Sequence, residues 1–197
     1  MSHLRVGEYV RRTKETDVTV RLDLDGKGES QIATGIHFFD HMLILFAKHG
    51  LFNLAIQCKG DIEVDGHHTV EDVGIALGEA LNLALAKKEG IARYGVAYVP
   101  MDEALCRTVV DFSGRAYLVC RAEFPSEKVG QLNTEWVEEF FRAMAVQARM
   151  NLHIEVLYGK NSHHIVEAMF KSAAKAICMA VSRDPRVDGI PSTKGVL

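Results

Sequence analysis

The sequence of 197 residues contains few cysteines and prolines, four of each, and no long apolar run. The cysteines form no CxxC pair, which argues against a cysteine zinc site and a disulfide framework and favours reduced thiols in the cytoplasm. The longest apolar runs, such as residues 43–47, are much shorter than the roughly 20 residues that span a bilayer. The N-terminal residues do not form a signal peptide. We therefore expect a cytoplasmic protein that does not bind membranes.

Strong charge of one sign is also missing, because 23 basic and 26 acidic residues leave a net charge of −3. Nucleic-acid binding usually needs a broad positive field, so we expect no nucleic-acid partner, although a local basic pocket remains open. Hydrophobic residues make up 48% of the chain, enough for a buried core and too many for disorder or a fibrous fold. Histidine is the conspicuous residue: seven of nine lie within residues 37–49, 67–68 and 163–164.

Hydrophobic periodicity predicts the same order of elements twice. In the first half, residues 17–24 alternate as a strand, residues 35–50 have helical spacing, and residues 52–60 form a second strand. A helix that begins at the histidine pair of residues 67–68 continues to Gly90. The second half predicts a strand at residues 104–115, a helix at 135–150, a strand at 151–160 and a helix at 163–181.

Matching residues support an internal duplication. Asp23 and Asp111 are 88 residues apart, and the pairs His67-His68 and His163-His164 are 96 apart within a shared HHxVE motif. Chance similarity between amphipathic segments is common, but the shared motif makes it a weaker explanation. We expect an α+β fold in which each half, residues 1–92 and 93–197, forms a sheet covered by helices, within one compact protein.

The repeated HHxVE motif has the spacing of a metal site. On a helix, Glu71 lies close to both His67 (i+4) and His68 (i+3), but the two histidines point about 100° apart. One ion could not easily take both, so the pattern suggests two metals. The copy supplies His163, His164 and Glu167. Exposed or capping histidines are the alternative for either motif alone; imidazole and carboxylate without thiolate favour Mn, Fe, Co, Ni or Zn.

Three further histidines lie in the segment at residues 37–49. His41 is a candidate ligand, and the repeat places Glu139 at the position 98 residues later. We interpret His37 as a partly buried core residue beside two phenylalanines. His49 ends a predicted helix, where capping and substrate contact are equally good explanations.

Four motifs, HFFDHML, HHTVEDVGIALG, GKNSHHIVEAMFK and IPSTKGVL, resemble the imidazoleglycerol-phosphate dehydratase family of histidine biosynthesis, and the resemblance runs from about Arg11 to the C-terminus. It implies a duplicated fold related to the GHMP-kinase and ribosomal-protein-like folds. It also implies two Mn²⁺ ions per active site, at subunit interfaces, and a homo-oligomer of 24 subunits. The implied substrate is a small phosphorylated imidazole.

The resemblance also implies roles for individual residues. The implied metal ligands are His41, His67, His68, Glu71, His163, His164 and Glu167. Many relatives carry histidine where this chain has Glu139, so Glu139 is a candidate ligand in its place. A substrate contact falls on Glu15, in addition to the candidate His49, and phosphate contacts fall on Arg93, Arg115, Ser192 and Lys194, the last two in a C-terminal substrate-binding tail. Glu15 is the candidate for proton transfer, and Glu71 and Glu167 complete the predicted catalytic carboxylates.

The implied reaction removes water from imidazole glycerol phosphate and yields imidazole acetol phosphate. Metals bound to both ring nitrogens would stabilise negative charge on the ring, which explains a need for two ions. Two alternatives remain at this point: a two-metal hydrolase that acts on a phosphoester or amide, and a metal-storage or scaffold protein without turnover.

Overall fold

The computed structural model describes residues 5–197, so residues 1–4 of the predicted first half lie outside the described residues. The first half folds into a four-stranded sheet with the strand order β1-β2-β4-β3. Its strands are β1 (Val6–Arg12), β2 (Thr16–Asp23), β3 (Ser30–Ala33) and β4 (Asn53–Gly60). Helix α1 (His37–Gly50) joins β3 to β4, and helix α2 (His67–Leu85) follows β4. β3 runs parallel to β4, whereas β2 is antiparallel to both of its neighbours.

The second half repeats this topology with the strand order β5-β6-β10-β7. Its strands are β5 (Tyr94–Met101), β6 (Ala104–Asp111), β7 (Tyr117–Arg121) and β10 (Asn151–Tyr158). Helix α3 (Glu135–Gln147) precedes β10, and helix α4 (Ser162–Val181) follows it. A small ribbon of β8 (Lys128–Val129) and β9 (Leu132–Asn133) is inserted before α3 and accounts for the longer repeat offset after this point. The predicted α+β duplication is confirmed.

The hydrophobic pattern predicts only the inner strands of each sheet. In the two four-stranded sheets, the strands that it misses are all edge strands, namely β1, β3, β5 and β7; it also misses the short ribbon of β8 and β9. Central strand β2 alternates between buried and exposed residues from Thr16 to Leu22, whereas edge strand β1 has only one buried residue, Gly7. The helix predicted to reach Gly90 ends at Leu85, because Ala86 has a left-handed φ of 48°.

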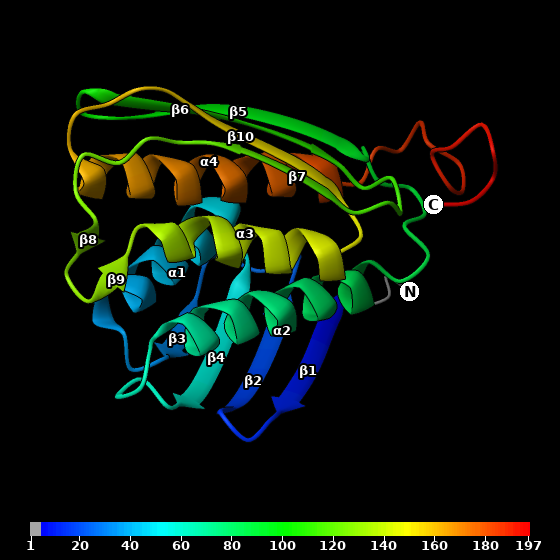
Figure 1. The fold of residues 1–197 in the computed structure, drawn as a ribbon. Helices are drawn as coiled ribbons and strands as arrows, with labels where there is room; N and C mark the ends of the chain where they lie inside the picture. The colour runs from blue at the N-terminus through cyan, green and yellow to red at the C-terminus, as the bar shows by residue number, and fades with distance from the viewer. Residues whose placement is uncertain (1–4) are drawn as a thin grey trace.

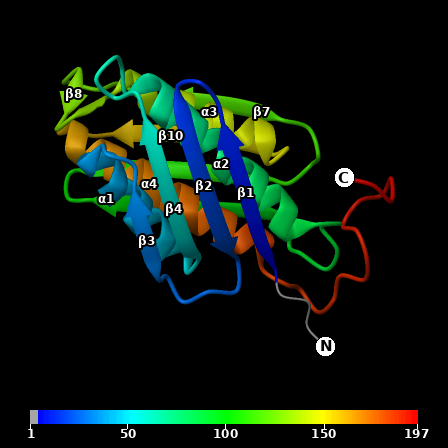
Figure 2. The same cartoon turned by 90° about the horizontal axis from the view of Figure 1, so that it is seen from below.

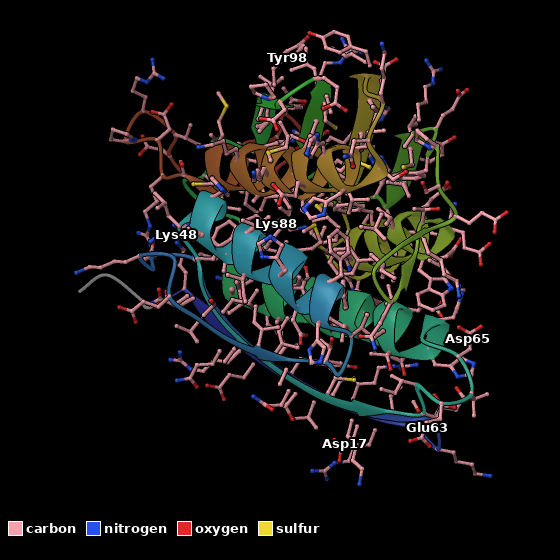
Figure 3. The ribbon with its side chains drawn as sticks, turned by 90° about the vertical axis from the view of Figure 1, so that its left-hand side faces the viewer. Asp17, Lys48, Glu63, Asp65, Lys88 and Tyr98 are labelled. Atoms are coloured by element: carbon pink, nitrogen blue, oxygen red, sulfur yellow. The ribbon has the colours of Figure 1, made fainter. Side chains whose placement is uncertain are left out.

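The molecule is layered as sheet, helices, helices, sheet. Figure 1 shows the β5-β6-β10-β7 sheet above the helices and the β1-β2-β4-β3 sheet below them. Seen from below in Figure 2, the first sheet lies across α1 and α2. In the middle, α2 packs against α3 and α1 packs against α4. Each sheet therefore buries one face against helices and leaves the other outside, as the labelled Asp17 and Tyr98 show at opposite extremes of Figure 3.

Buried aromatic rings join the helices at the centre. Phe140 of α3 has its ring centroid 5.3 Å from that of Phe39 in α1 and 5.2 Å from that of Phe170 in α4. All three side chains are fully buried, so this cluster fixes α1 against α4. Within residues 5–197, no helix is both long enough and apolar enough to cross a membrane.

Candidate metal and substrate site

One group of side chains at the contact between α1 and α4 has the arrangement of a metal site. Nε2 of His41 and Nε2 of His163 each lie 3.2 Å from Oε1 of Glu167. In the part of the chain that the structure describes, these residues form the one group of three or more potential ligands whose atoms lie within 4.8 Å of one another. The histidines are partly exposed, but the Glu167 side chain is only 8% exposed. The site is therefore anchored on a buried carboxylate and open on its histidine side.

Glu167 is held in its ionised form. Burial alone would raise its pKa, but the hydrogen bond from Lys171, the hydrogen bond from His41 and the lysine charge together lower the pKa below its usual value. Nζ of Lys171 lies 2.6 Å from Oε2 of Glu167, which leaves Oε1 facing the two histidines. An ionised carboxylate is a ready ligand for a divalent cation.

The group of side chains equivalent to His163, Glu167 and His41 consists of His67, Glu71 and Glu139, and it lies where α2 packs against α3. Nε2 of His67 is 3.8 Å from Oε2 of Glu71, and the two side chains are partly exposed, at 38% and 44%. Glu139, the repeat counterpart of His41, forms an ion pair with Arg142 in which Nε and Oε2 are 3.6 Å apart. Glu139 as a metal ligand stays a prediction.

In each histidine doublet the two rings diverge. The ring planes of His67 and His68 are 84° apart with centroids separated by 6.3 Å, and those of His163 and His164 are 81° apart with centroids separated by 6.0 Å. The first histidine of each doublet faces the glutamate four residues later. The second faces carboxylates of nearby turns and loops, Asp61 and Glu15 for His68, and Glu103 and Asp102 for His164. The two histidines of each doublet therefore have different partners, as expected for adjacent positions on a helix.

The second histidines are each surrounded by carboxylates. Nδ1 of His68 lies 3.2 Å from both carboxylate oxygens of Asp61 and 3.9 Å from Oε2 of Glu15. The hydrogen bond with Asp61 raises the pKa of His68. In the second half, Nδ1 of His164 lies 2.6 Å from Oε2 of Glu103, a contact that raises the histidine pKa and lowers that of Glu103 to about 2.

Together these side chains offer imidazole nitrogens and carboxylate oxygens without a thiolate. This donor set suits a divalent transition-metal cation such as Mn, Fe, Co, Ni or Zn. The four cysteines are free thiols. Burial raises the pKa of Cys106 to about 11, so this thiol remains protonated at neutral pH.

The predicted phosphate-binding residues lie around one surface hollow of about 670 Å³. The hollow is lined by Arg93, Arg115, Ser192 and Lys194, among others. Nε of Arg93 donates to Asp111 over 2.7 Å, and Nη1 donates to the carbonyl oxygen of Pro191 over 2.8 Å. Arg93 therefore also fixes the C-terminal tail against the second sheet.

The two remaining histidines of α1, His49 and His37, lie in different environments. Burial, followed by the charges of Lys171 and Lys175, lowers the pKa of His49. His49 thus lies close to the lysine that holds Glu167, a position compatible with substrate contact. The interpretation of His37 as a core residue is wrong: its side chain is 90% exposed, because it projects into solvent from the first turn of α1.

Three residues of this region are absent from the set inferred from the sequence: Asp61, Glu103 and Lys171. Asp61 belongs to no motif that could have signalled it, whereas Lys171 ends the GKNSHHIVEAMFK motif and follows Glu167 by four residues, the spacing of a helical ion pair. Glu103 could have been found, because it stands 88 residues after Glu15, the same offset that relates Asp23 to Asp111.

Comparison with known proteins decides the family. Residues 34–177 match the family model described as imidazoleglycerol-phosphate dehydratase. The chain belongs to this family. Among its relatives, the imidazoleglycerol-phosphate dehydratase of Acetivibrio thermocellus is 56% identical over 190 residues, 96% of this chain and 97% of that protein. The Shouchella clausii enzyme of the same name is 58% identical over the same shares of both chains.

Solved structures of the family have the same fold. The imidazoleglycerol-phosphate dehydratase of Staphylococcus aureus superposes with a TM-score of 0.82 at 40% identity, covering 91% of this chain and 99% of that one. The Pyrococcus furiosus structure, a complex with (S)-C348, also has a TM-score of 0.82 at 36% identity, covering 96% and 100%. Imidazoleglycerol-phosphate dehydratases remove water from their substrate in histidine biosynthesis, and this lyase reaction is the function of the chain.

Proposed function

We propose that the dehydration requires two Mn²⁺ ions per active site and converts imidazole glycerol phosphate into imidazole acetol phosphate. The observation that carries this proposal is the triad of His41, His163 and Glu167, together with its counterpart in the other half. The proposed ligands are His41, His67, His68, Glu71, Glu139, His163, His164 and Glu167. The halves at residues 1–92 and 93–197 act as one enzyme.

When bound, the metal supplies Lewis acidity at the imidazole ring of the substrate. The remaining work falls to the chain's own side chains. Glu15 moves the proton: its carboxylate is about half exposed on the turn between β1 and β2, and its Oε2 is 3.9 Å from Nδ1 of His68. An accessible carboxylate beside a ligand is well placed for general acid–base catalysis.

The substrate phosphate binds in the hollow at the C-terminal tail. Arg115 and Lys194 are exposed there, and Arg115 can present a planar fork of donors to phosphate oxygens. Ser192 adds a hydroxyl, while Arg93 keeps the tail in place through Asp111 and Pro191. His49 contacts the substrate from the end of α1.

We further propose that the chain assembles into a homo-oligomer of 24 subunits in which neighbouring chains complete each site. The diverging rings of each doublet support this proposal, because one histidine faces its own chain's glutamate and the other faces away from it. Metal binding and assembly are then linked equilibria.

The outer face of the second sheet is the supporting surface for assembly. Val96, Tyr98 and Val109 are 47%, 55% and 39% exposed and line a shallow hollow of about 560 Å³. The positions equivalent to Val96 and Val109 in the first sheet are Glu8 and Arg21, which form an exposed ion pair. An exposed apolar patch that its structural copy replaces with charge indicates a subunit contact.

The activity test uses the full-length protein loaded with Mn²⁺ and imidazole glycerol phosphate, with the ketone product followed over time. We expect turnover in the wild type and its loss in His163→Ala. A hydrolase or a metal-storage protein predicts bound metal without dehydration, so a metal-loaded but inactive wild type would contradict the proposed function. An unchanged rate in His163→Ala would contradict the ligand assignment alone.

The assembly test measures native mass with and without a chelator. We expect a large Mn²⁺-dependent particle that becomes smaller on metal removal. Tyr98→Asp should also reduce the mass, whereas Val10→Asp, the equivalent change on the first sheet, should not. A small particle of constant mass in every condition would overturn the assembly proposal.

A further inference from the structure

The turns that precede the two central strands are structural copies with different side-chain roles. The turn between β1 and β2 carries Glu15, and the turn between β5 and β6 carries Glu103 at the equivalent position, 88 residues later. Each glutamate lies beside the second histidine of its half, His68 or His164. The proposed function assigns proton transfer to Glu15 but gives its structural copy Glu103 no role.

Glu103 is fixed by three hydrogen bonds. Its Oε1 accepts from the backbone N–H of Lys160 over 3.0 Å and from that of Asn161 over 2.8 Å. Its Oε2 lies 2.6 Å from Nδ1 of His164. The turn itself is tight, because Met101 pairs with Ala104 and leaves only Asp102 and Glu103 between the strands. Both carboxylate oxygens are therefore already in use.

Glu15 has a different environment. Its backbone is held, since its N–H donates to Oγ1 of Thr13 over 3.1 Å and its carbonyl oxygen accepts from the N–H of Asp61 over 3.1 Å. Its carboxylate, by contrast, is 3.9 Å from His68, beyond hydrogen-bond distance. In this half Asp61 occupies Nδ1 of the histidine.

Loop length explains the difference. Six residues, 61–66, connect β4 to α2, and the first of them is Asp61. Only three residues, 159–161, connect β10 to α4, and Gly159 stands where Asp61 would be. The shorter loop has no carboxylate for its histidine, and the glutamate of the neighbouring turn takes that position.

We infer that Glu103 is the positioning residue of His164, that Asp61 has the same role for His68, and that Glu15 is thereby left free for proton transfer. The inference rests on the proposed role of both histidines as metal ligands. When Nδ1–H donates to a carboxylate, the proton is fixed on that nitrogen and the lone pair of Nε2 is directed at the metal. A carboxylate behind a ligating imidazole also makes the ligand more basic.

The experiment titrates metal-free, full-length protein with Mn²⁺ and follows free Mn²⁺ by electron paramagnetic resonance. Loss of such a partner typically costs about 10- to 100-fold in metal affinity, and we expect Glu103→Ala to weaken one class of site by that factor. Glu103→Gln should retain part of the affinity, because its single amide oxygen can still accept from Nδ1–H while the backbone N–H groups of Lys160 and Asn161 lose their acceptor. Glu123→Ala, at an exposed position, is the matched control and should bind as the wild type does.

A double-mutant cycle separates positioning from general loosening of the loop before α4. If Glu103 acts through His164, Glu103→Ala causes no further loss of Mn²⁺ affinity once His164 is alanine. Additive losses would overturn the inference, as would wild-type affinity in Glu103→Ala or equal losses in Glu103→Ala and Glu103→Gln. If the His164→Ala variant binds Mn²⁺ with wild-type affinity, the proposed role of His164 as a ligand is contradicted. Additive losses contradict only the positioning role of Glu103, so the two failures are distinguishable.

Discussion

The two halves of the chain share an interior and differ at their surfaces. An ideal Cβ on Gly7 of β1 would lie 1.9 Å from the carbonyl oxygen of Ala80 in α2, and one on Gly95 of β5 would lie 1.9 Å from that of Ala176 in α4. The same close approach of strand and helix is thus retained in both copies. On the outer faces, by contrast, Glu8 and Arg21 correspond to two valines. Close packing constrains the buried positions, while exposed positions remain free to change.

The metal motifs of the two halves also differ, at the position four residues after each glutamate. Lys171 follows Glu167 by four residues and donates to it, whereas Ile75 stands four residues after Glu71. The Glu167 side chain is 8% exposed and that of Glu71 is 44% exposed. Identical motifs therefore lie in different surroundings, one already organised by hydrogen bonds within the chain and the other more exposed.

The largest expected effect comes from removing a ligand in either half. Glu167→Ala and Glu71→Ala should each reduce kcat by roughly 10³-fold, because a catalytic metal contributes several kcal/mol of transition-state stabilisation. The measurements are steady-state rates and bound Mn²⁺ per subunit. If only Glu167→Ala loses activity, the halves are unequal in function as well as in exposure.

The next effect distinguishes the two equivalent glutamates. Glu15→Gln should lower kcat by about 100-fold or more with Mn²⁺ affinity unchanged, as expected for loss of a general acid–base group. Glu103→Gln should change kcat far less. The check is a kcat and Mn²⁺-affinity measurement on both variants, and equal losses of kcat would remove the division of roles between them.

The equivalent turns after β2 and β6 carry Lys27 and Arg115. Arg115→Ala should raise KM by about 10- to 100-fold, since a hydrogen bond to a charged group contributes about 1.5–3 kcal/mol. Lys27→Ala should leave KM unchanged, because Lys27 lies outside the phosphate hollow. Steady-state kinetics with the phosphorylated substrate test this pair, and an equal rise in both variants would count against a single phosphate site at the C-terminal tail.

The shared interior can be tested with Gly7→Ala and Gly95→Ala. Each added methyl group meets a backbone oxygen, and overpacking of this kind typically costs about 1–3 kcal/mol in the free energy of unfolding. Thermal unfolding should show similar decreases in Tm for both variants. Thr19→Ala, at an exposed position on the first sheet, should stay within about 0.5 kcal/mol of the wild type. Unequal decreases for the two glycines would show that the strand–helix contacts are not equivalent.

The smallest effect is a shift in the pH dependence of Mn²⁺ binding. In the metal-free protein, Asp61 raises the pKa of His68 and Glu103 raises that of His164 above 6.5. The protonated rings are therefore favoured until the pH rises through the raised pKa, and Mn²⁺ must displace those protons. The Mn²⁺ affinity should decrease as the pH is lowered from above 6.5. In Glu103→Gln, part of this decrease should occur at a lower pH, because His164 loses the carboxylate that raises its pKa. A pH profile that is identical in this variant would contradict the assigned cause.

Much of the fold follows from local pattern. The inner strands and all four long helices have strong periodicity, because each presents one face to a core and the other to water. The edge strands do not, since β1, β3, β5 and β7 each pair with one neighbour only and are covered less completely. The histidine doublets were informative because helical spacing fixes the directions of adjacent side chains.

The sequence by itself determined the duplication and the α+β class and supplied the candidate ligand types, since these depend on residue identity at fixed spacing along one element. Tertiary structure alone decided which side chains meet across elements. It placed His41 beside Glu167 from another helix, Lys171 on the far oxygen of that carboxylate, and Glu103 behind His164. These contacts depend on how layers pack and on the length of the loop before α4. A residue pattern within one segment does not determine the distances between side chains that come from different elements.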